Sequence, residues 1–502
     1  MEGLDRRAFL ARAGGVALAT ATGLGPGWEA VAGATGGSAA ADPRLRALAR
    51  AVRGTVLARG ARGYASAARV FNARFDGVAP LAVLLCERES DVQAAVRWAR
   101  RYGVRMVARS GGHSYAGYST VPGGLVIDLR RLRSVRYDRA SRTAVVGAGA
   151  RLIDVYAGLA RSGVTVPGGS CPTVGIGGLA LGGGVGLAAR RFGTTSDSIV
   201  ALRIVTADGR LLTASRDSHP DLFWACRGGG GGNFGIVTAF RFRAHPARSA
   251  AFFFARWPFA QAAEVVAAWQ ALAPHAPDQL YSLCTLAGGG GGGGATITAL
   301  GQFFGSAAAL RRTIRPLTRV GTPALTVGSD SYLRLQLRWA GCLGQSVAAC
   351  ARPAHQAFAA KSDYVRRPLP AAGRERLVHA VAGAGGLGAG VAAILDSYGG
   401  AINRVPASAT AFVHRDELYS IQWFSSWSGA GQAGGAARWL RGAHRALRPY
   451  VSGAAYQNYI DPELEGWERA YYGRNLPRLI ATKRRYDPDG LFRFRQGIPR
   501  RG

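Results

Sequence analysis

The stretch Arg109-Ser110-Gly111-Gly112-His113-Ser114-Tyr115 follows an apolar segment at 104–108 that has the composition of a buried strand. Two adjacent glycines let backbone N–H groups come close to an anionic group such as a pyrophosphate. A histidine in such a loop lies beside whatever the loop holds. Taken alone, the pattern fits a tight turn with a hydrogen-bonded histidine equally well.

Two further glycine-rich stretches remove most of this ambiguity. Residues 166–186 read VPGGSCPTVGIGGLALGGGVG and contain Cys171, and residues 227–238 read RGGGGGNFGIVT before another strand-like segment. Glycine loses more conformational entropy on folding than other residues, so such clusters are expected where backbone lies against a planar ligand or a phosphate. Compositional drift explains one cluster but not three that each adjoin a strand, and we infer a cofactor site.

Length and composition are typical of a folded protein with two lobes: 502 residues, 48% hydrophobic and 18% charged. The formal net charge of +34 comes almost entirely from arginine. Such a charge can indicate binding to polyanions such as nucleic acid. The arginines are dispersed, however, and no basic run is interleaved with aromatic residues. We therefore interpret the charge as a compositional bias and expect no nucleic-acid partner.

Residues 1–34 predict a targeting signal. Arg6 and Arg7 form a twin-arginine pair, and the apolar stretch 13–24 is too short to span a membrane. The alternative is an accidental arginine pair before an alanine-rich helix. Twin-arginine export carries folded proteins, which suits a chain that acquires its cofactor before export. We expect a secreted or extracytoplasmic monomer without stable membrane association.

Short apolar runs alternate with helical stretches, which predicts an α+β fold. We expect strands at 81–86, 104–108, 124–129 and 143–146 and helices at 90–102 and 152–162. A second region, which begins near 245, has a predicted helix over 257–273 and strands at 281–286, 295–304 and 419–427.

Six cysteines lie at positions 86, 171, 226, 284, 342 and 350 without a C-x-x-C spacing. The spacing argues against zinc and iron–sulfur sites, so we expect no metal. Cys342 and Cys350 are close enough in sequence to form a disulfide in an oxidising compartment, but free thiols fit the sequence equally well.

Together the motifs resemble those of the berberine-bridge-enzyme-like group of FAD-linked oxidases, in the vanillyl-alcohol-oxidase superfamily. The resemblance covers about residues 78–498. It rests on RSGGHSYAG at 109–117, GGSCPTVGIGG at 168–178, RGGGGGNFGIVT at 227–238, and YQNYID and YDPDGLFRFRQGI at 456–461 and 486–498. This order and spacing are far more specific than a lone G-x-G.

The resemblance implies a two-lobed, PCMH-type FAD-binding domain and a substrate domain with an antiparallel sheet backed by helices. The FAD-binding domain would span 76–246 and the substrate domain 247–450. A C-terminal segment at 451–502 would complete the FAD-binding domain.

The resemblance also implies that FAD is bonded covalently to two side chains. His113 would bond the flavin 8α-methyl carbon and Cys171 would bond ring carbon 6. An imidazole nitrogen and a thiolate are suitable nucleophiles for these carbons. The other expected cofactor contacts are Arg109, Ser110, Gly111, Gly112, Ser114, Val174, Gly175, Gly177, Gly178, Gly235, Ile236, Val237 and Asn458.

The implied reaction is oxidation of a CH–OH group of a carbohydrate or bulky secondary metabolite by hydride transfer to flavin N5. A tyrosinate can take the hydroxyl proton if its pKa is lowered. Tyr459 is the first candidate base and Tyr456 the second, with Gln422 and Tyr115 as further catalytic residues. Many relatives carry a tyrosine at the position of Val185, so a relay between two tyrosines is in doubt.

Molecular oxygen is the expected electron acceptor. In the family the position of Val174 lies beside the oxygen-reactive flavin carbon, where valine goes with oxygen access and leucine with its exclusion. The alternatives are a dehydrogenase with another acceptor, an oxidative cyclase of a secondary metabolite, and a polyanion-binding secreted protein with a vestigial flavin. Intact His113, Cys171, Gln422 and Tyr459 argue against the last. No motif within 247–450 identifies the substrate.

Overall fold

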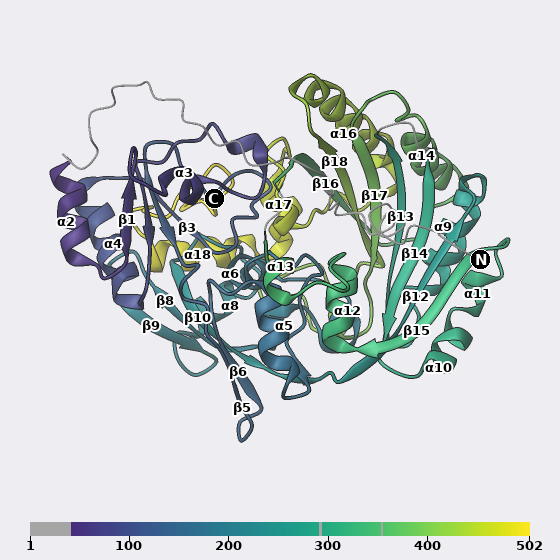
Figure 1. Cartoon of the computed structure of the whole chain (residues 1–502), viewed down its shortest axis with the longest axis horizontal. Coiled ribbons are helices and arrows are strands. Elements are labelled where there is room, and N and C mark those ends of the chain that lie inside the picture. The colour runs from purple at the N-terminus through teal and green to yellow at the C-terminus, as the bar shows by residue number, and fades with distance from the viewer. Residues whose placement is uncertain (1–41, 291–293, 353–354, 502) are drawn as a thin grey trace.

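The computed structural model describes residues 42–290, 294–352 and 355–501. The targeting signal predicted for residues 1–34 lies outside this part of the chain. Among the described helices, none combines the length and the apolar character that crossing a membrane requires. The described residues form two halves that lie side by side, each built on its own sheets (Figure 1).

The first half contains two sheets and the helices packed on them. One sheet, in which the last three strands are parallel, has the order β1 (Thr55–Ala58), β2 (Ala82–Leu85), β4 (Leu125–Asp128), β3 (Met106–Arg109). The other is antiparallel, with the order β5 (Val135–Asp138), β6 (Thr143–Gly147), β10 (Ile236–Arg243), β8 (Ile199–Val205), β9 (Leu211–Ser215). The predicted helices correspond to α4 (Glu89–Tyr102) and α5 (Leu152–Ala160).

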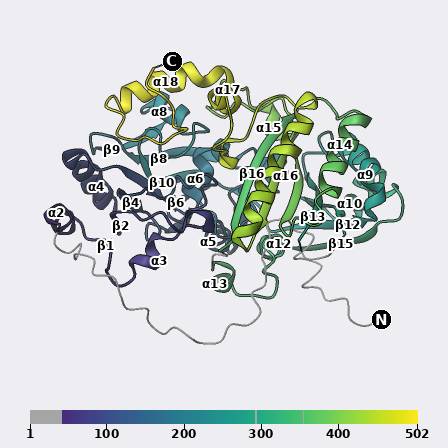
Figure 2. The ribbon, with the colours of Figure 1, turned by 90° about the horizontal axis from the view of Figure 1, so that it is seen from above.

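The second half is a seven-stranded antiparallel sheet. Its order is β15 (Ala324–Ser331), β12 (Ser249–Trp257), β14 (Thr296–Phe303), β13 (Leu280–Gly289), β17 (Gly390–Ser397), β18 (Tyr419–Trp427), β16 (Ala357–Val365). Helices cover one face, as Figures 1 and 2 show: α9 (Ala262–Leu272), α14 (Ala371–Ala382) and α16 (Ala433–Leu447). The predicted α+β class, with an antiparallel sheet backed by helices, is confirmed.

The two faces of this sheet are buried against different partners. Side chains alternate along a strand, so Ile421 and Trp423 of β18 pack under the helices. On the opposite face, Phe254 and Leu300 pack with Leu187 of the first half. Because both faces are covered, the strands are apolar over most of their length, and one face remains available to form a wall between the halves.

The helix predicted over 257–273 is wrong at its start. Residues Ser249–Trp257 form strand β12, and the helix begins only at Ala262. The run SAAFFFARW lacks alternation because it pairs on both sides, with β14 and β15, and is buried on both faces. Pro258 follows the strand at once and has no N–H to continue the ladder.

The C-terminal tail packs on the first half. Helix α18 (Leu476–Tyr486) contacts α8 (Pro220–Ala225), and Figure 2 shows the tail over that half. The buried ammonium of Lys483 donates to the backbone oxygens of Asn233 and Phe492, at 2.7 and 2.6 Å, and pairs with Asp487 at 2.6 Å. The third glycine-rich stretch is therefore fixed by the end of the chain.

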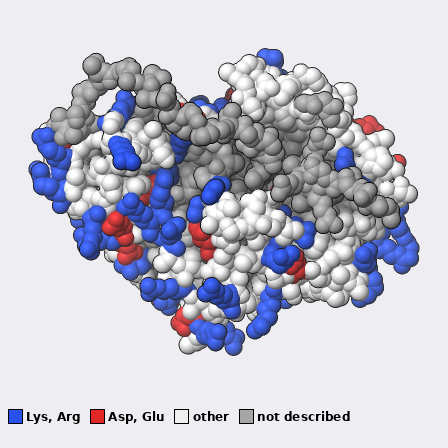
Figure 3. All heavy atoms as spheres, in the orientation of Figure 1, with Lys and Arg blue, Asp and Glu red and all other residues white. Residues whose placement is uncertain are grey.

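Basic side chains are dispersed over the surface. On the face shown in Figure 3 they occur over both halves with acidic side chains among them, and they do not gather in one patch. Exposed pairs such as Arg100–Asp489 and Arg131–Glu87 bring some of them together with carboxylates. Exposed ion pairs contribute little to stability, so this charge has no structural role that the fold requires.

Candidate cofactor and active site

A cavity of about 1780 Å³ is lined by residues of both halves. Pockets for drug-sized ligands are commonly about 300–1,000 Å³. The cavity can therefore hold a dinucleotide-sized cofactor together with a substrate.

All but one of the predicted site residues line this cavity. From the loop after β3 come Ser110, Gly111, Gly112, His113, Ser114 and Tyr115. The other two glycine-rich stretches contribute Cys171, Val174, Gly175, Gly177, Gly178, Gly235, Ile236 and Val237, and the strand and tail contribute Gln422, Tyr456, Asn458 and Tyr459. Segments that lie more than 300 residues apart in the sequence thus meet around one space.

The glycines of the first two loops serve two purposes. A Cβ on Gly111 would overlap the backbone of Gly175, and a Cβ on Gly175 would overlap Ser110 and Gly111, so the two loops touch backbone to backbone. Gly178 differs, because a Cβ there would meet no atom within 4 Å. Its bare backbone faces open space in the cavity, as expected where a flat cofactor lies.

Arg109 is the exception, and its predicted role as a cofactor contact is corrected. Its guanidinium is buried, donates to Asp128 at 2.7 Å, and donates to the carbonyls of Ala68 and Arg69 at 3.3 and 3.4 Å. Asp128 ends the neighbouring strand β4, so the pair supports the glycine loop from behind. A buried guanidinium stays charged, and burying that charge is costly unless it is paired, so the pairing with Asp128 explains its place.

Thr173 links the two residues proposed to bond the cofactor. Its hydroxyl lies 2.9 Å from Nε2 of His113 and 3.9 Å from the sulfur of Cys171. The imidazole also stacks on Phe71, with ring centroids 3.8 Å apart. The sequence pattern pointed to His113 and Cys171 but not to Thr173, which is an unremarkable threonine in a proline–valine context.

Burial sets the protonation of both groups. It lowers the pKa of His113 to about 3, so the imidazole is neutral at pH 7 and has a nitrogen lone pair. Burial raises the pKa of the Cys171 thiol, while hydrogen bonds from Thr173 oppose that effect. His113 is therefore ready for bond formation, whereas Cys171 must first lose a proton.

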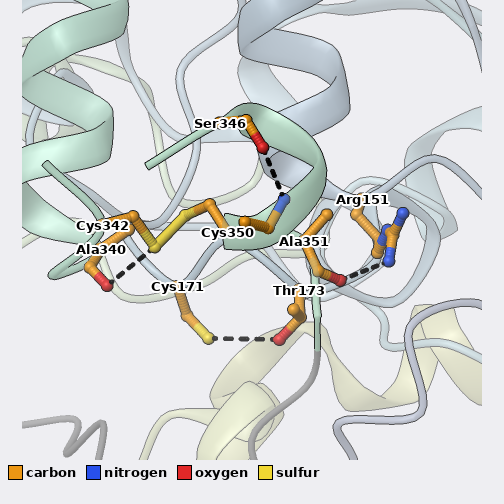
Figure 4. Close-up of a disulfide and its surroundings, with 9 residues drawn as sticks. Arg151, Cys171, Thr173, Ala340, Cys342, Ser346, Cys350 and Ala351 are labelled. Atoms are coloured by element: carbon orange, nitrogen blue, oxygen red, sulfur yellow. Dashed lines mark hydrogen bonds between the residues drawn. A yellow bond between two sulfur atoms is a disulfide. The ribbon is translucent and has the colours of Figure 1, made fainter. Parts of the chain in front are cut away.

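A disulfide closes one side of the cavity. Cys342 and Cys350 are bonded, with Cα atoms 5.5 Å apart, which resolves the alternative that the sequence left open. Their loop joins α12 (Tyr332–Trp339) to α13 (Val347–Cys350) and lies beside Cys171 in Figure 4. Arg151 of the first half donates to the carbonyl of Ala351 in this loop. This hydrogen bond ties the loop, and with it the second half, to the first half.

The predicted catalytic side chains form one connected group. Tyr115 and Tyr459 stack with ring centroids 5.4 Å apart and an interplanar angle of 11°. The amide of Gln422 donates to the Tyr115 hydroxyl at 3.0 Å. The Tyr456 hydroxyl accepts from the backbone N–H of Gly184 and from the Asn458 amide, both at 2.9 Å.

These contacts separate the two candidate bases. The Tyr456 hydroxyl already accepts two hydrogen bonds and holds the 182–184 segment. The Tyr459 hydroxyl makes no hydrogen bond to any residue within the described ranges, although Tyr459 lines the cavity. Tyr459 is therefore the tyrosine whose hydroxyl is available to a substrate.

Neither candidate tyrosine meets the condition for a tyrosinate base, which is a lowered pKa. Burial raises the pKa of Tyr459 well above its ordinary value, and the charge of Asp396 raises it further. Burial also raises the pKa of Tyr456 to about 12, although hydrogen bonds from Asn458 and the 184–185 backbone oppose it. Both phenols are neutral at pH 7.

Asp396 is the group that the sequence analysis missed. It lies on β17, lines the cavity and is 9% exposed, and it accepts a hydrogen bond from the Tyr281 hydroxyl at 3.1 Å. Burial raises the pKa of its carboxyl to about 7. The available signal was a lone acidic residue in the apolar run GVAAILDS. A carboxyl that titrates near neutral pH in a cavity is a suitable general base.

Comparison with known proteins identifies the family of the chain. A family model described as an FAD binding domain matches residues 80–215, and one described as berberine and berberine like matches residues 455–499. The chain is 34% identical over 424 residues to the uncharacterized FAD-linked oxidoreductase YgaK of Bacillus subtilis, which covers 84% of this chain and 91% of YgaK.

Solved structures share the whole fold. BBE-like 1 of Physcomitrella patens has a TM-score of 0.84 at 34% identity, over 91% of this chain and 99% of that one. Wild-type Phl p 4, a glucose dehydrogenase, has a TM-score of 0.81 at 28% identity, over 91% of this chain and 99% of that one. The isoleucine-to-valine variant of Phl p 4 is a glucose oxidase. The family matches, the identity to YgaK and the shared fold show that this chain belongs to the berberine-bridge-enzyme-like family of FAD-linked oxidoreductases.

Proposed function

We propose that this chain is an exported enzyme that holds FAD through covalent bonds to His113 and Cys171. It oxidises a CH–OH group of a small molecule, with molecular oxygen as the acceptor. The observation that carries the proposal is the convergence of His113, Cys171, Tyr459 and Asp396 on one cavity. Nucleophiles for the cofactor and a proton acceptor for the substrate thus line the same space.

The residues present fit FAD. The cavity is large, Gly178 offers open backbone, and His113 is neutral and held in place by Phe71 and Thr173. The cofactor would bind within 76–246 and 451–502, and the substrate within 247–450. The family models matched at 80–215 and 455–499 support this division.

The protein's own part in the reaction is proton transfer and orientation. When bound, FAD supplies the two-electron acceptor. Asp396 takes the proton from the substrate hydroxyl, and the Tyr459 hydroxyl, which is free to bind a substrate, orients that group. These roles agree with the pKa values, because the Asp396 carboxylate is available near pH 7 while the Tyr459 phenol is neutral. Tyr115 accepts a hydrogen bond from Gln422 and holds the Tyr459 ring by stacking.

The proposal that molecular oxygen is the electron acceptor rests on Val174. This small side chain lines the cavity three residues after Cys171. In Phl p 4 an isoleucine-to-valine change accompanies the difference between a glucose dehydrogenase and a glucose oxidase. One branched side chain can therefore decide the acceptor in this fold, and a dehydrogenase that uses another acceptor is the second candidate.

Flavin colour tests the proposed reaction. The purified protein should be yellow, should bleach when an alcohol substrate is added without oxygen, and should regain its colour in air with formation of hydrogen peroxide. A protein that bleaches but recovers only with an artificial acceptor is a dehydrogenase. A protein that purifies without flavin contradicts the proposal.

A further inference from the structure

The sheet wall of the cavity is apolar for most of its width. Asp396 on β17 pairs with Leu283 on β13, Leu283 pairs with Leu300 on β14, and Leu300 pairs with Phe254 on β12. All four residues line the cavity. Cross-strand partners share a face of a sheet, so a continuous hydrocarbon strip leads away from the proposed proton acceptor.

Several polar groups near this strip are already hydrogen-bonded to one another, although the amide nitrogen of Gln302 has no partner among the described residues and Thr285 and Thr326 also line the cavity. Tyr281 donates to Asp396 at 3.1 Å, and Gln422 donates to Tyr115 at 3.0 Å. The indole N–H of Trp339 donates to Gln302 at 3.1 Å. A sugar needs donors and acceptors for several hydroxyls, because a buried hydroxyl without a partner is costly. The strip instead suits a flat apolar ring.

A cation lies beyond the far end of the strip. Arg338 on α12 lines the cavity, and its guanidinium carbon lies 4.2 Å from the centroid of the Phe252 ring. Its side chain is only 18% exposed, and its nearest carboxylate, Asp330, is 3.6 Å from one terminal nitrogen. Its Nε is buried and has no hydrogen-bond partner within the described part of the chain. Such a donor is stabilised when an acceptor enters the cavity.

We propose that the substrate is an elongated aromatic alcohol with a carboxylate at the end opposite its CH–OH group. The CH–OH end lies at Tyr459 and Asp396, the rings lie along the apolar strip, and Arg338 binds the carboxylate. Three strand spacings separate β17 from β12, which is about 14 Å. That span suits two rings in line better than one. This inference rests on the proposed function and specifies its substrate class.

The reaction balances with the groups already named. A bound flavin would accept the hydride of the primary alcohol and Asp396 would accept its hydroxyl proton, so that the product leaves as the aldehyde. Molecular oxygen then takes the two electrons and two protons as hydrogen peroxide. The distant carboxylate is unchanged and serves only in binding.

A matched pair of compounds tests the inference. We would measure anaerobic flavin reduction of the holoenzyme by 4′-(hydroxymethyl)biphenyl-4-carboxylate and by the corresponding carboxamide, with glucose and cellobiose in the same panel. The carboxylate should be preferred over the carboxamide about tenfold or more in kcat/KM, as expected for a charge-assisted hydrogen bond. In Arg338→Gln this ratio should fall to about one.

Arg100→Gln is the control, because Arg100 does not line the cavity, pairs with Asp489 at 2.9 Å and is 54% exposed. It should keep the preference for the carboxylate. Equal rates for the two compounds in the unmodified enzyme would overturn the inference without any need for a folded variant. A preference for the carboxylate that survives in folded Arg338→Gln would overturn it as well. Reduction by sugars but not by the biphenyls overturns the inference and leaves the proposed function standing. A flavin that dithionite reduces but that no compound in the panel reduces counts against both.

Discussion

The hydroxyl of Thr173 lies 2.9 Å from Nε2 of His113 and 3.9 Å from the sulfur of Cys171, so one side chain contacts both proposed attachment residues. It holds the imidazole in a fixed orientation. Its contact with the Cys171 sulfur, drawn in Figure 4, stabilises the thiolate and so lowers the pKa of the thiol. Because burial raises the pKa of Cys171, removing the thiol proton is the difficult step in forming the sulfur bond.

Thr173→Val should therefore slow covalent attachment of the flavin. Valine has nearly the shape of threonine but lacks the hydroxyl, so the cavity keeps its form while the bridge is lost. The fraction of flavin released by acid, measured at intervals after FAD is added to apoprotein, should be higher than for the unmodified chain. Thr482→Val is a matched control, because Thr482 is buried and bonds only within its own helix. If both covalent bonds to the flavin form at an unchanged rate in Thr173→Val, Thr173 has no role in the attachment.

The rate of flavin reduction should rise with pH through about 7. Asp396 accepts a proton only as a carboxylate, and its pKa is raised to about 7, so the active form gains population as pH increases. Asp396→Asn should remove this dependence and lower kcat/KM about 100-fold or more. Tyr281→Phe should move the midpoint upward, because the hydrogen bond from Tyr281 stabilises the carboxylate. Stopped-flow reduction across pH 5–9 checks all three, and a flat profile in the unmodified enzyme would exclude Asp396 as the acceptor.

Val174→Leu should slow reoxidation of the reduced flavin in air. The larger side chain fills space in the cavity where oxygen would approach, while the hydride and proton transfers use other residues. Reduction by substrate, measured without oxygen, should remain nearly unchanged and serves as the control. If both forms reoxidise at the same rate, Val174 does not govern oxygen access.

Replacing both Arg6 and Arg7 with lysine should block export. Twin-arginine transport depends on the arginine pair, so a folded, yellow precursor should accumulate in the cytoplasm. Cell fractionation with detection of bound flavin measures this. Secretion at the normal level would refute the prediction that residues 1–34 are a twin-arginine signal.

The glycine motifs predicted that loops distant in the sequence meet around one space, and they do line one cavity. Gly111 and Gly175 must be glycine because their backbones touch, and such a constraint leaves a visible mark in the sequence. The strand at 419–427 and the helix ending at Tyr102 were also evident, since their apolar patterns are strong. Strand β12 was not, because burial on both faces removes the alternation that distinguishes a strand from a helix.

The rest of the site depends on register between distant strands. Asp396, Leu283 and Leu300 come together only because β17, β13 and β14 pair in one register, which no local pattern encodes. The role of Arg109 was hidden for a similar reason, since its partner Asp128 lies on a different strand. The pKa of Tyr459 likewise depends on burial and on Asp396, and neither is visible in the motif around it.

Acid precipitation tests the two covalent bonds most directly, because denaturation releases a cofactor that is held non-covalently but not one that is attached covalently. The precipitated chain should retain its flavin, and mass spectrometry of its peptides should find flavin joined to both His113 and Cys171. His113→Ala should keep flavin through Cys171, Cys171→Ala should keep it through His113, and only the double variant should lose it. Release of free FAD from the unmodified chain would contradict the proposed linkage.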